Sequence, residues 1–304
     1  MEQDQQEIKK SGMITICGRP NVGKSTLTNC LVGEKVAIVT NKPQTTRNRI
    51  CAVLNRKGTQ FVFVDTPGLV RARTKLGDYM VKVVEDSVAD VDAVMLLVEP
   101  IPNVGGTEQT LCEKIARLGA PAILVINKID TLSRKEDILP VIAAYQAVYP
   151  FDAVIPISAK TGDGVEDLLD TLDAYLNPGP QLFPFDMVTD QPEKQILAEI
   201  LREKLLICLD QEVPHGTAVE ITRFSERTDS EIIDVDATIY CEKESHKGII
   251  IGKHGSMLKK ISSMARTDME RFMGTKIYLQ TWVKVKENWR DNPNMIRSLG
   301  YGDD

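Results

Sequence analysis

The chain has 304 residues, of which 42% are hydrophobic and 26% charged, and its formal net charge is −6. This length is typical of about two domains, and the hydrophobic content is sufficient for packed cores. No apolar run reaches the roughly 18 residues of a membrane-spanning helix, and the first ten residues are too polar for a signal peptide. We therefore expect a cytoplasmic chain without a transmembrane segment. The six cysteines are scattered, so we expect reduced thiols and neither a zinc site nor disulfides.

Residues 8–177 alternate short apolar runs with longer helix-like stretches. The apolar runs, each expected to form a strand, are 13–17, 49–54, 61–65, 93–98, 122–126 and 153–157. Such alternation is typical of βα units on a parallel sheet, with ligand sites at the carboxyl ends of the strands. The sequence therefore predicts an α/β domain over 8–177 with a mostly parallel six-stranded sheet.

The stretch NPGPQLFPFD (177–186) contains three prolines and a glycine, and it predicts a linker over 178–190. Beyond it, leucines and isoleucines at helical spacing predict a helix within 192–212. Two strand-like segments follow at 217–224 and 232–242, and after them come a glycine-bounded helical region and a last strand-like segment at 276–289. This order predicts an α+β domain over 191–290 with the succession α-β-β-α-α-β, and a C-terminal tail over 291–304.

The stretch GRPNVGKST (18–26) satisfies the pattern G-x-x-x-x-G-K-[ST] between an expected strand and an expected helix, which is the context of a phosphate-binding loop. Gly18 and Gly23 allow backbone N–H groups to point at phosphates, and Lys24 can bridge the β- and γ-phosphates. Ser25 is expected to ligate Mg²⁺. The nucleotide-binding residues expected here are Gly18, Arg19, Pro20, Asn21, Val22, Gly23, Lys24, Ser25 and Thr26.

The stretch DTPG (65–68) ends an expected strand. This position places the Asp65 carboxylate where it can hold Mg²⁺, and the N–H of Gly68 can meet a γ-phosphate. Thr66 and Pro67 complete this part of the nucleotide site.

In QTTRNR (44–49), either Thr45 or Thr46 can close over the metal ion, and we favour Thr46. Leu69 follows the DTPG stretch and cannot orient an attacking water, and neither can the apolar Val22. Hydrolysis is therefore expected to depend on charge and position.

The stretch NKID (127–130) follows an expected strand and predicts the base. Asp130 can accept hydrogen bonds from N1–H and the exocyclic amino group of guanine, Asn127 can bond the base and brace the loop, and the Lys128 stem can lie along the ring. Adenine presents the wrong edge and leaves the carboxylate unpaired. The stretch SAK, comprising Ser158, Ala159 and Lys160, is expected to add the Ala159 N–H to the guanine oxygen.

These motifs, in this order, resemble the GTPase domain of the TrmE-Era-EngA type. Within that group the chain resembles the Era family of bacterial ribosome-assembly GTPases, and the resemblance extends past the linker. It implies GTP as substrate, Mg²⁺ as cofactor held by Ser25, Thr46 and Asp65, and Asn21, Lys24, Thr46 and Gly68 as the catalytic residues. It also implies that Asn21 helps to bind a K⁺ ion beside the β- and γ-phosphates. The alternative is that Asn21 only shapes the loop.

The charge of the C-terminal part is divided. Residues 181–242 carry 5 Lys/Arg and 14 Asp/Glu, a net charge of −9, whereas residues 243–290 carry 11 and 4, a net charge of +7. Within the basic segment, KGIIIGKHGSMLKKI (247–261) contains a G-x-x-G turn. The turn and the α-β-β-α-α-β order resemble a type II KH domain, which implies binding of single-stranded RNA. The expected RNA-binding residues are Ile249, Ile250, Ile251, Gly252, Lys253, His254, Gly255, Lys259 and Lys260.

By resemblance, we expect a monomeric GTP-hydrolysing switch that binds the 3′ end of 16S rRNA and acts in 30S subunit maturation. The family also implies that the GTP state alters the loops at 33–47 and 66–77 and, through them, the exposure of the RNA groove. Peripheral contact with the inner face of the cell membrane is a further expectation. The competing hypothesis is a membrane-associated signalling GTPase whose KH-like module binds protein.

Overall fold

The computed structural model describes residues 7–68, 74–87, 91–228 and 230–301. Contacts between residues divide the chain into two compact units. The first unit holds most of the residues up to Asp190. The second holds the residues from Gln191 onward, together with Ile38–Thr45 and the described part of Ala72–Tyr79. The division by contacts falls between Asp190 and Gln191, and two short segments of the N-terminal part group with the C-terminal unit.

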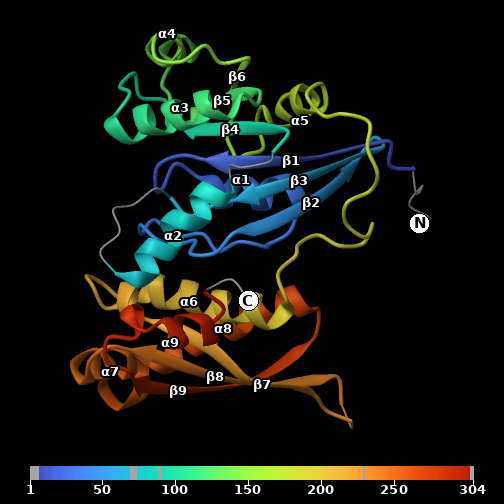
Figure 1. The fold of residues 1–304 in the computed structure, drawn as a ribbon. Coiled ribbons are helices and arrows are strands. Elements are labelled where there is room, and N and C mark those ends of the chain that lie inside the picture. Colours follow the sequence, from blue (N-terminus) through green and yellow to red (C-terminus); the bar gives the residue numbers. More distant parts are fainter. Residues whose placement is uncertain (1–6, 69–73, 88–90, 229, 302–304) are drawn as a thin grey trace. The chain divides into compact units, whose positions relative to one another are not determined.

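The first unit contains the predicted six-stranded sheet (Figure 1). Its strands are β1 (Lys10–Cys17), β2 (Ile50–Arg56), β3 (Thr59–Asp65), β4 (Ala93–Val98), β5 (Ala122–Ile126) and β6 (Ala153–Pro156). Their spatial order is β2-β3-β1-β4-β5-β6, and only β2 runs antiparallel to its neighbour. The prediction of a mostly parallel sheet is confirmed.

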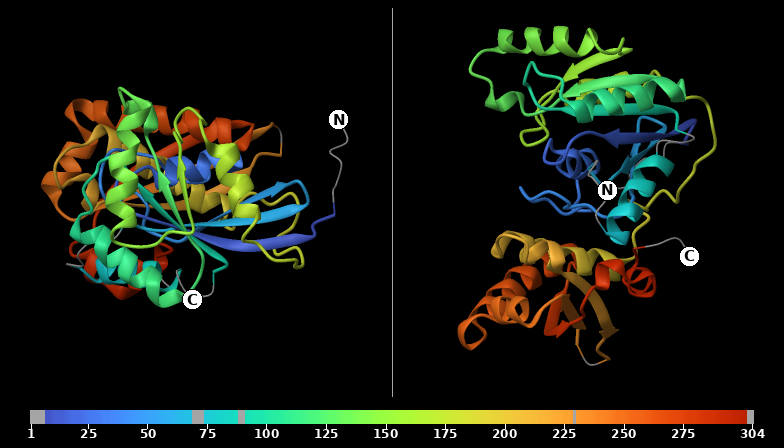
Figure 2. Two further views of the ribbon diagram at one scale, coloured as in Figure 1. Left: turned by 90° about the horizontal axis from the view of Figure 1, so that it is seen from above. Right: turned by 60° about the vertical axis from the view of Figure 1, so that its left-hand side comes forward.

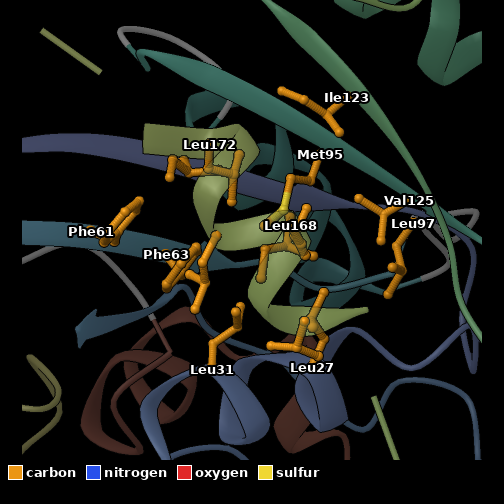
Figure 3. Close-up of a cluster of buried hydrophobic side chains, with 14 of the residues drawn as sticks. Leu27, Leu31, Phe61, Phe63, Met95, Leu97, Ile123, Val125, Leu168 and Leu172 are labelled. Carbon is orange, nitrogen blue, oxygen red and sulfur yellow. The ribbon is translucent and has the colours of Figure 1, made fainter. Parts of the chain in front are cut away.

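Helices cover both faces of this sheet, as a parallel sheet requires. They are α1 (Lys24–Val32), α3 (Gly106–Leu118), α4 (Leu139–Gln146) and α5 (Val165–Asp173). A further helix, α2 (Lys75–Asp86), begins in the segment that groups with the second unit and continues into the first. Side chains of α1 and α5 form one core with alternate residues of the central strands (Figure 3). The intervening strand residues pack against α3 and α4 on the other face. This double burial explains why the strands read as continuous apolar runs.

The predicted linker over 178–190 packs along the first unit. It forms isolated bridges from Pro178 to Lys10 and from Thr189 to Ala52 on the edge strand β2. The buried Gln60 side chain binds it as well, accepting from the Phe183 N–H at 2.8 Å and donating to the Phe183 carbonyl at 2.9 Å. Because an exposed edge strand invites pairing with another chain, this segment shields the edge.

The second unit follows the predicted α-β-β-α-α-β order (Figure 2). Its elements are α6 (Glu193–Cys208), β7 (Ala218–Glu226), β8 (Ile232–Cys241), α7 (Glu244–Ile251), α8 (Ser256–Met273) and β9 (Lys276–Val285). The sheet order is β7-β8-β9, with β7 antiparallel and β9 parallel to β8. Apolar residues of α6, α7 and α8 pack on one face of this sheet.

The residues predicted to be a C-terminal tail are folded up to Tyr301. Residues Pro293–Ser298 form a further helix, α9, and Tyr301 is buried. Trp289 is fully buried and donates from Nε1 to the Gly216 carbonyl at 2.9 Å. The second unit therefore extends beyond the predicted end at residue 290.

The segment Ile38–Thr45 groups with the second unit because helix α6 binds its backbone. The Val39 N–H donates to Glu203 Oε1 at 2.9 Å, and the Arg202 guanidinium donates to the Thr45 carbonyl. Lys204 donates to Glu203 and to Asp268 on α8. Three consecutive charged residues of α6 are therefore buried, and each has an oppositely charged or carbonyl partner.

Within the described ranges, no helix has both the length and the apolar character needed to cross a membrane.

Candidate nucleotide site and nucleic-acid interface

The loop between β1 and α1 requires glycine at two positions. Gly18 and Gly23 have φ values of 152° and 104°. A Cβ on Gly23 would lie 2.3 Å from Asn127 Nδ2, and one on Gly18 would lie 2.4 Å from the Leu97 carbonyl oxygen. Side chains at these positions would displace the loop from the strand ends, so the sequence pattern and the geometry agree.

Lys24 lies beneath this loop and is 7% exposed. Its Nζ donates to the carbonyls of Gly18 at 3.1 Å and Arg19 at 3.0 Å. Burial lowers the pKa of Lys24, while the nearby Asp65 carboxylate acts in the opposite direction. Its two hydrogen bonds to loop carbonyls hold the Lys24 side chain against the predicted phosphate-binding loop.

Three predicted metal ligands converge at the start of α1. The Ser25 hydroxyl lies 2.8 Å from Asp65 Oδ2 and 2.9 Å from Thr46 Oγ1. Burial raises the pKa of Asp65 to about 6, against the opposing effects of Lys24 and the Ser25 hydroxyl. Two hydroxyls and a carboxylate are oxygen donors that suit Mg²⁺, and a cation would favour the ionised carboxylate.

The structure separates the two threonines between which the sequence left the choice open. The Thr45 hydroxyl bonds within its own segment, to the Lys42 carbonyl and the Thr40 hydroxyl, each at 2.7 Å. Thr46 is 8% exposed and lies beside Ser25. The geometry therefore supports Thr46, although its role as a metal ligand stays a prediction.

The DTPG turn packs against the phosphate loop. A Cβ on Gly68 would lie 3.0 Å from the Pro20 side chain, and the Thr66 hydroxyl donates to the Ile16 carbonyl at 3.0 Å. Val22 is fully buried and packs in the core, which agrees with its exclusion as a water-orienting group. Leu69 lies outside the described residues.

Asn127 braces the base-recognition loop as predicted. Its Nδ2 donates to the Val22 carbonyl at 2.8 Å, which ties this loop to the phosphate loop. Its Oδ1 accepts from the Ala159 N–H at 2.9 Å. That amide was expected to reach the guanine oxygen, so this role requires the amide to change partner. Ser158 donates to Asp130 Oδ1 at 2.7 Å and fixes the exposed carboxylate expected to read the base.

Two acidic residues of this site, Glu99 and Glu108, escaped the sequence analysis. Glu99 follows β4 and binds Lys128 and Arg19, while Glu108 lies in the first turn of α3 and binds Arg19. Neither belongs to a recognised motif. The only available signal was an acidic residue directly after a buried parallel strand, a position where ligand sites gather.

The G-x-x-G turn links α7 to α8. Gly252 and Gly255 have φ values of 71° and 78°, and His254 between them has 51°. A Cβ on Gly252 would lie 2.7 Å from Met257 Cβ. Lys253 and His254 are exposed at the tip, so the turn presents a basic, closely approachable backbone.

A groove of about 390 Å³ runs from this turn along α8 to β9. Its lining residues are Gly255, Leu258, Lys259, Ser262, Ser263, Arg266, Leu279 and Thr281. On α8 the polar residues recur at helical spacing, and Leu279 and Thr281 point to the same face of the strand because side chains alternate. The lining therefore combines two leucines with three hydroxyl groups and two cations.

The predicted RNA-binding residues distribute unevenly around this groove. Gly255 and Lys259 line it, whereas Lys260 is exposed but is not among the lining residues. Ile250 is fully buried in the core, and Ile249 is 50% exposed. Sequence reasoning missed the serines of α8 and the contribution of β9, because the pairing of a helix with a distant strand is a tertiary property.

Together, the phosphate loop, the base-recognition loop and the G-x-x-G groove define a P-loop GTPase joined to a KH domain. Residues 13–128 match the family described as 50S ribosome-binding GTPase, and residues 212–290 match the KH domain family. GTPase Era of Ruminiclostridium cellulolyticum is 50% identical over 292 residues, which cover 96% of this chain and 97% of that protein. The chain therefore belongs to the Era family of GTPases.

Further relatives match over nearly the whole length of the chain. GTPase Era of Clostridioides difficile is 48% identical over 294 residues, covering 97% of this chain and 99% of that protein. Two solved structures superpose on this chain with TM-scores of 0.93 at 36% identity. Each match covers 97% of this chain and 100% of the solved chain. One is a variant of Aquifex aeolicus Era bound to GDP·AlF₄⁻, and the other is Era with MgGDPNP and nucleotides 1506–1542 of 16S ribosomal RNA.

Proposed function

We propose that this GTPase binds the 3′ end of 16S rRNA through its KH unit and acts in the assembly of the 30S subunit in the cytoplasm. The observation that carries the proposal is the groove beside the G-x-x-G turn, which is lined by leucines, hydroxyl groups and two cations. The relative solved with MgGDPNP and a 16S rRNA fragment supports the choice of RNA.

At the nucleotide site, the loop amides and Lys24 receive the β- and γ-phosphates of GTP. Ser25, Thr46 and Asp65 are the residues that would hold Mg²⁺, which neutralises phosphate charge when bound. Asp130, fixed by Ser158, accepts from the guanine edge. The MgGDPNP bound to the solved relative supports this assignment.

Asn21 is proposed to contribute to a K⁺ site beside the phosphates. Its backbone has a φ of 66°, and its carbonyl accepts from Lys128 Nζ at 2.7 Å, so the loop holds it in one conformation. GTP turnover in K⁺ should exceed turnover in Na⁺, and Asn21→Ala and Asn21→Asp should abolish the difference. Equal rates of the unaltered protein in the two salts would contradict this role.

Unpaired bases are proposed to lie in the groove, with phosphates beside its two cations. Leu258 and Leu279 offer apolar contact, and the Ser262 and Thr281 hydroxyls, 2.9 Å apart, can exchange their mutual hydrogen bond for base edges. Lys259 and Arg266 can meet phosphates. This division of labour suits a single strand, because its base edges are accessible.

The proposal is tested by replacing Lys253 and His254 at the tip of the turn with aspartate. The paired change should weaken binding of an oligonucleotide with the 16S 3′-terminal sequence by about 100-fold, because two like charges would face the phosphates. GTP turnover should remain unchanged. RNA binding that survives the change would contradict a role of this turn in holding the RNA.

A further inference from the structure

Four charged side chains of the first unit form a continuous row between the phosphate loop and the base-recognition loop. Glu108 binds Arg19 Nε, and Arg19 Nη2 lies 3.4 Å from Glu99 Oε2. Glu99 Oε1 in turn lies 2.6 Å from Lys128 Nζ. Two acids and two bases alternate, so each charge has an opposite neighbour.

The row is anchored at one end by a buried carboxylate. The side chain of Glu108 is 1% exposed and lies in the first turn of α3, where the helix dipole favours a negative charge. Gly105 leaves room for it, since a Cβ there would lie 2.8 Å from Glu108 Oε2. A buried carboxylate is costly without a partner, so Arg19 is held in place.

The other end of the row holds two strained residues together. Lys128 and Asn21 are non-glycine residues with φ values of 64° and 66°, and Lys128 Nζ donates to the Asn21 carbonyl at 2.7 Å. Such conformations persist where surrounding contacts over-determine them. The bond from Glu99 to the same Nζ supplies a second constraint on the Lys128 side chain.

We propose that Glu99 is a positioning residue for nucleotide binding, which couples the phosphate loop to the base-recognition loop by holding Arg19 and Lys128 as one preassembled unit with Glu108. The inference rests on the proposed assignment of 127–130 as the guanine loop. The Lys128 side chain is held at its Nζ by Glu99 and the Asn21 carbonyl, so a nucleotide whose base lies along its stem does not have to order it.

Glu99 and Glu108 lie beside the two loops and not at the reacting phosphate. The ion pairs that they form should therefore affect binding of the nucleotide and not the chemical step. Their loss should therefore raise KM and the nucleotide dissociation rate while leaving kcat nearly unchanged. The row is about one third exposed at three of its four members, so we expect a moderate effect of about tenfold.

The test measures dissociation of fluorescently labelled GDP from Glu99→Gln, Glu108→Gln and the double variant. Each single change should accelerate dissociation by about tenfold. The double variant should release GDP no more than about twice as fast as either single variant, because each single change already interrupts the same row of ion pairs. Glu99→Asp should recover part of the loss. Multiplying effects in the double variant, or a rate unchanged by Glu99→Gln, would overturn the inference.

Two controls separate this result from other causes. Glu113→Gln alters an exposed acid on the same helix and should leave dissociation unchanged. Glu99 is 28% exposed, so its variant is expected to fold, and equal melting temperatures would exclude general destabilisation. Should Glu108→Gln fail to fold, Arg19→Met replaces it in the comparison of single and double variants.

Failure of the guanine assignment is detected separately with Asp130→Asn. An amide can donate where the carboxylate accepts, so this variant should shift preference from GDP toward xanthosine diphosphate. An unshifted preference would remove the assignment itself. If the nucleotide preference shifts but Glu99→Gln leaves GDP dissociation unchanged, only the positioning role of Glu99 is contradicted.

Discussion

The nucleotide site and the RNA groove of this chain are built from different parts. In the nucleotide site, main-chain groups and buried side chains are fixed by bonds between loops, such as that from Asn127 to the Val22 carbonyl. In the groove, partly exposed side chains of α8 and β9 form an open surface. A site assembled from backbone should fail when one atom is misplaced, whereas a site assembled from side chains should weaken in steps.

The largest effect expected from this contrast is that of Gly23→Ala. The new Cβ would lie 2.3 Å from Asn127 Nδ2 at a φ of 104°, so both loops must move. We expect GTP affinity to fall by more than about 100-fold, as measured by equilibrium titration. Gly106→Ala, where a Cβ meets nothing within 4 Å, serves as the control and should bind GTP normally.

An intermediate effect is expected from Gly252→Ala, because Gly252 is a position in the proposed RNA site at which the backbone itself requires glycine. The Cβ would lie 2.9 Å from the Met257 N at a φ of 71°, so the turn should shift and RNA affinity should fall by about 10- to 30-fold. GTP turnover should be unaffected. Gly248→Ala in α7 has open space around the new Cβ, and an equal loss of RNA binding there would contradict a local effect.

The smallest effects are expected from single cations of the groove. Arg266→Ala and Lys259→Ala should each lower RNA affinity by about three- to tenfold and reduce the slope of log affinity against log salt by about 1. Lys260→Ala, outside the lining, should change little. Filter binding at several salt concentrations measures all three, and a Lys260 effect equal to that of Lys259 would extend the groove.

The same contrast explains how far the sequence could be read. Continuous apolar strands and the G-x-x-x-x-G-K-[ST] pattern predicted the sheet and the phosphate loop, because local glycine and helix requirements determine them. Sequence reasoning missed Glu99, Glu108 and the β9 side of the groove. Their roles depend on contacts between residues far apart in the chain, as Arg19 and Glu108 are, and no local spacing records such contacts.

The three buried charges of helix α6 add a consequence for experiments in different buffers. Glu203 and Lys204 have side chains that are 4% and 8% exposed, whereas the Arg266 side chain at the groove is 49% exposed. Dissolved ions screen exposed charges over about 8 Å at physiological ionic strength but act weakly on buried pairs. Raising the salt concentration should thus release RNA from the KH surface while α6 keeps its hold on the Val39 backbone.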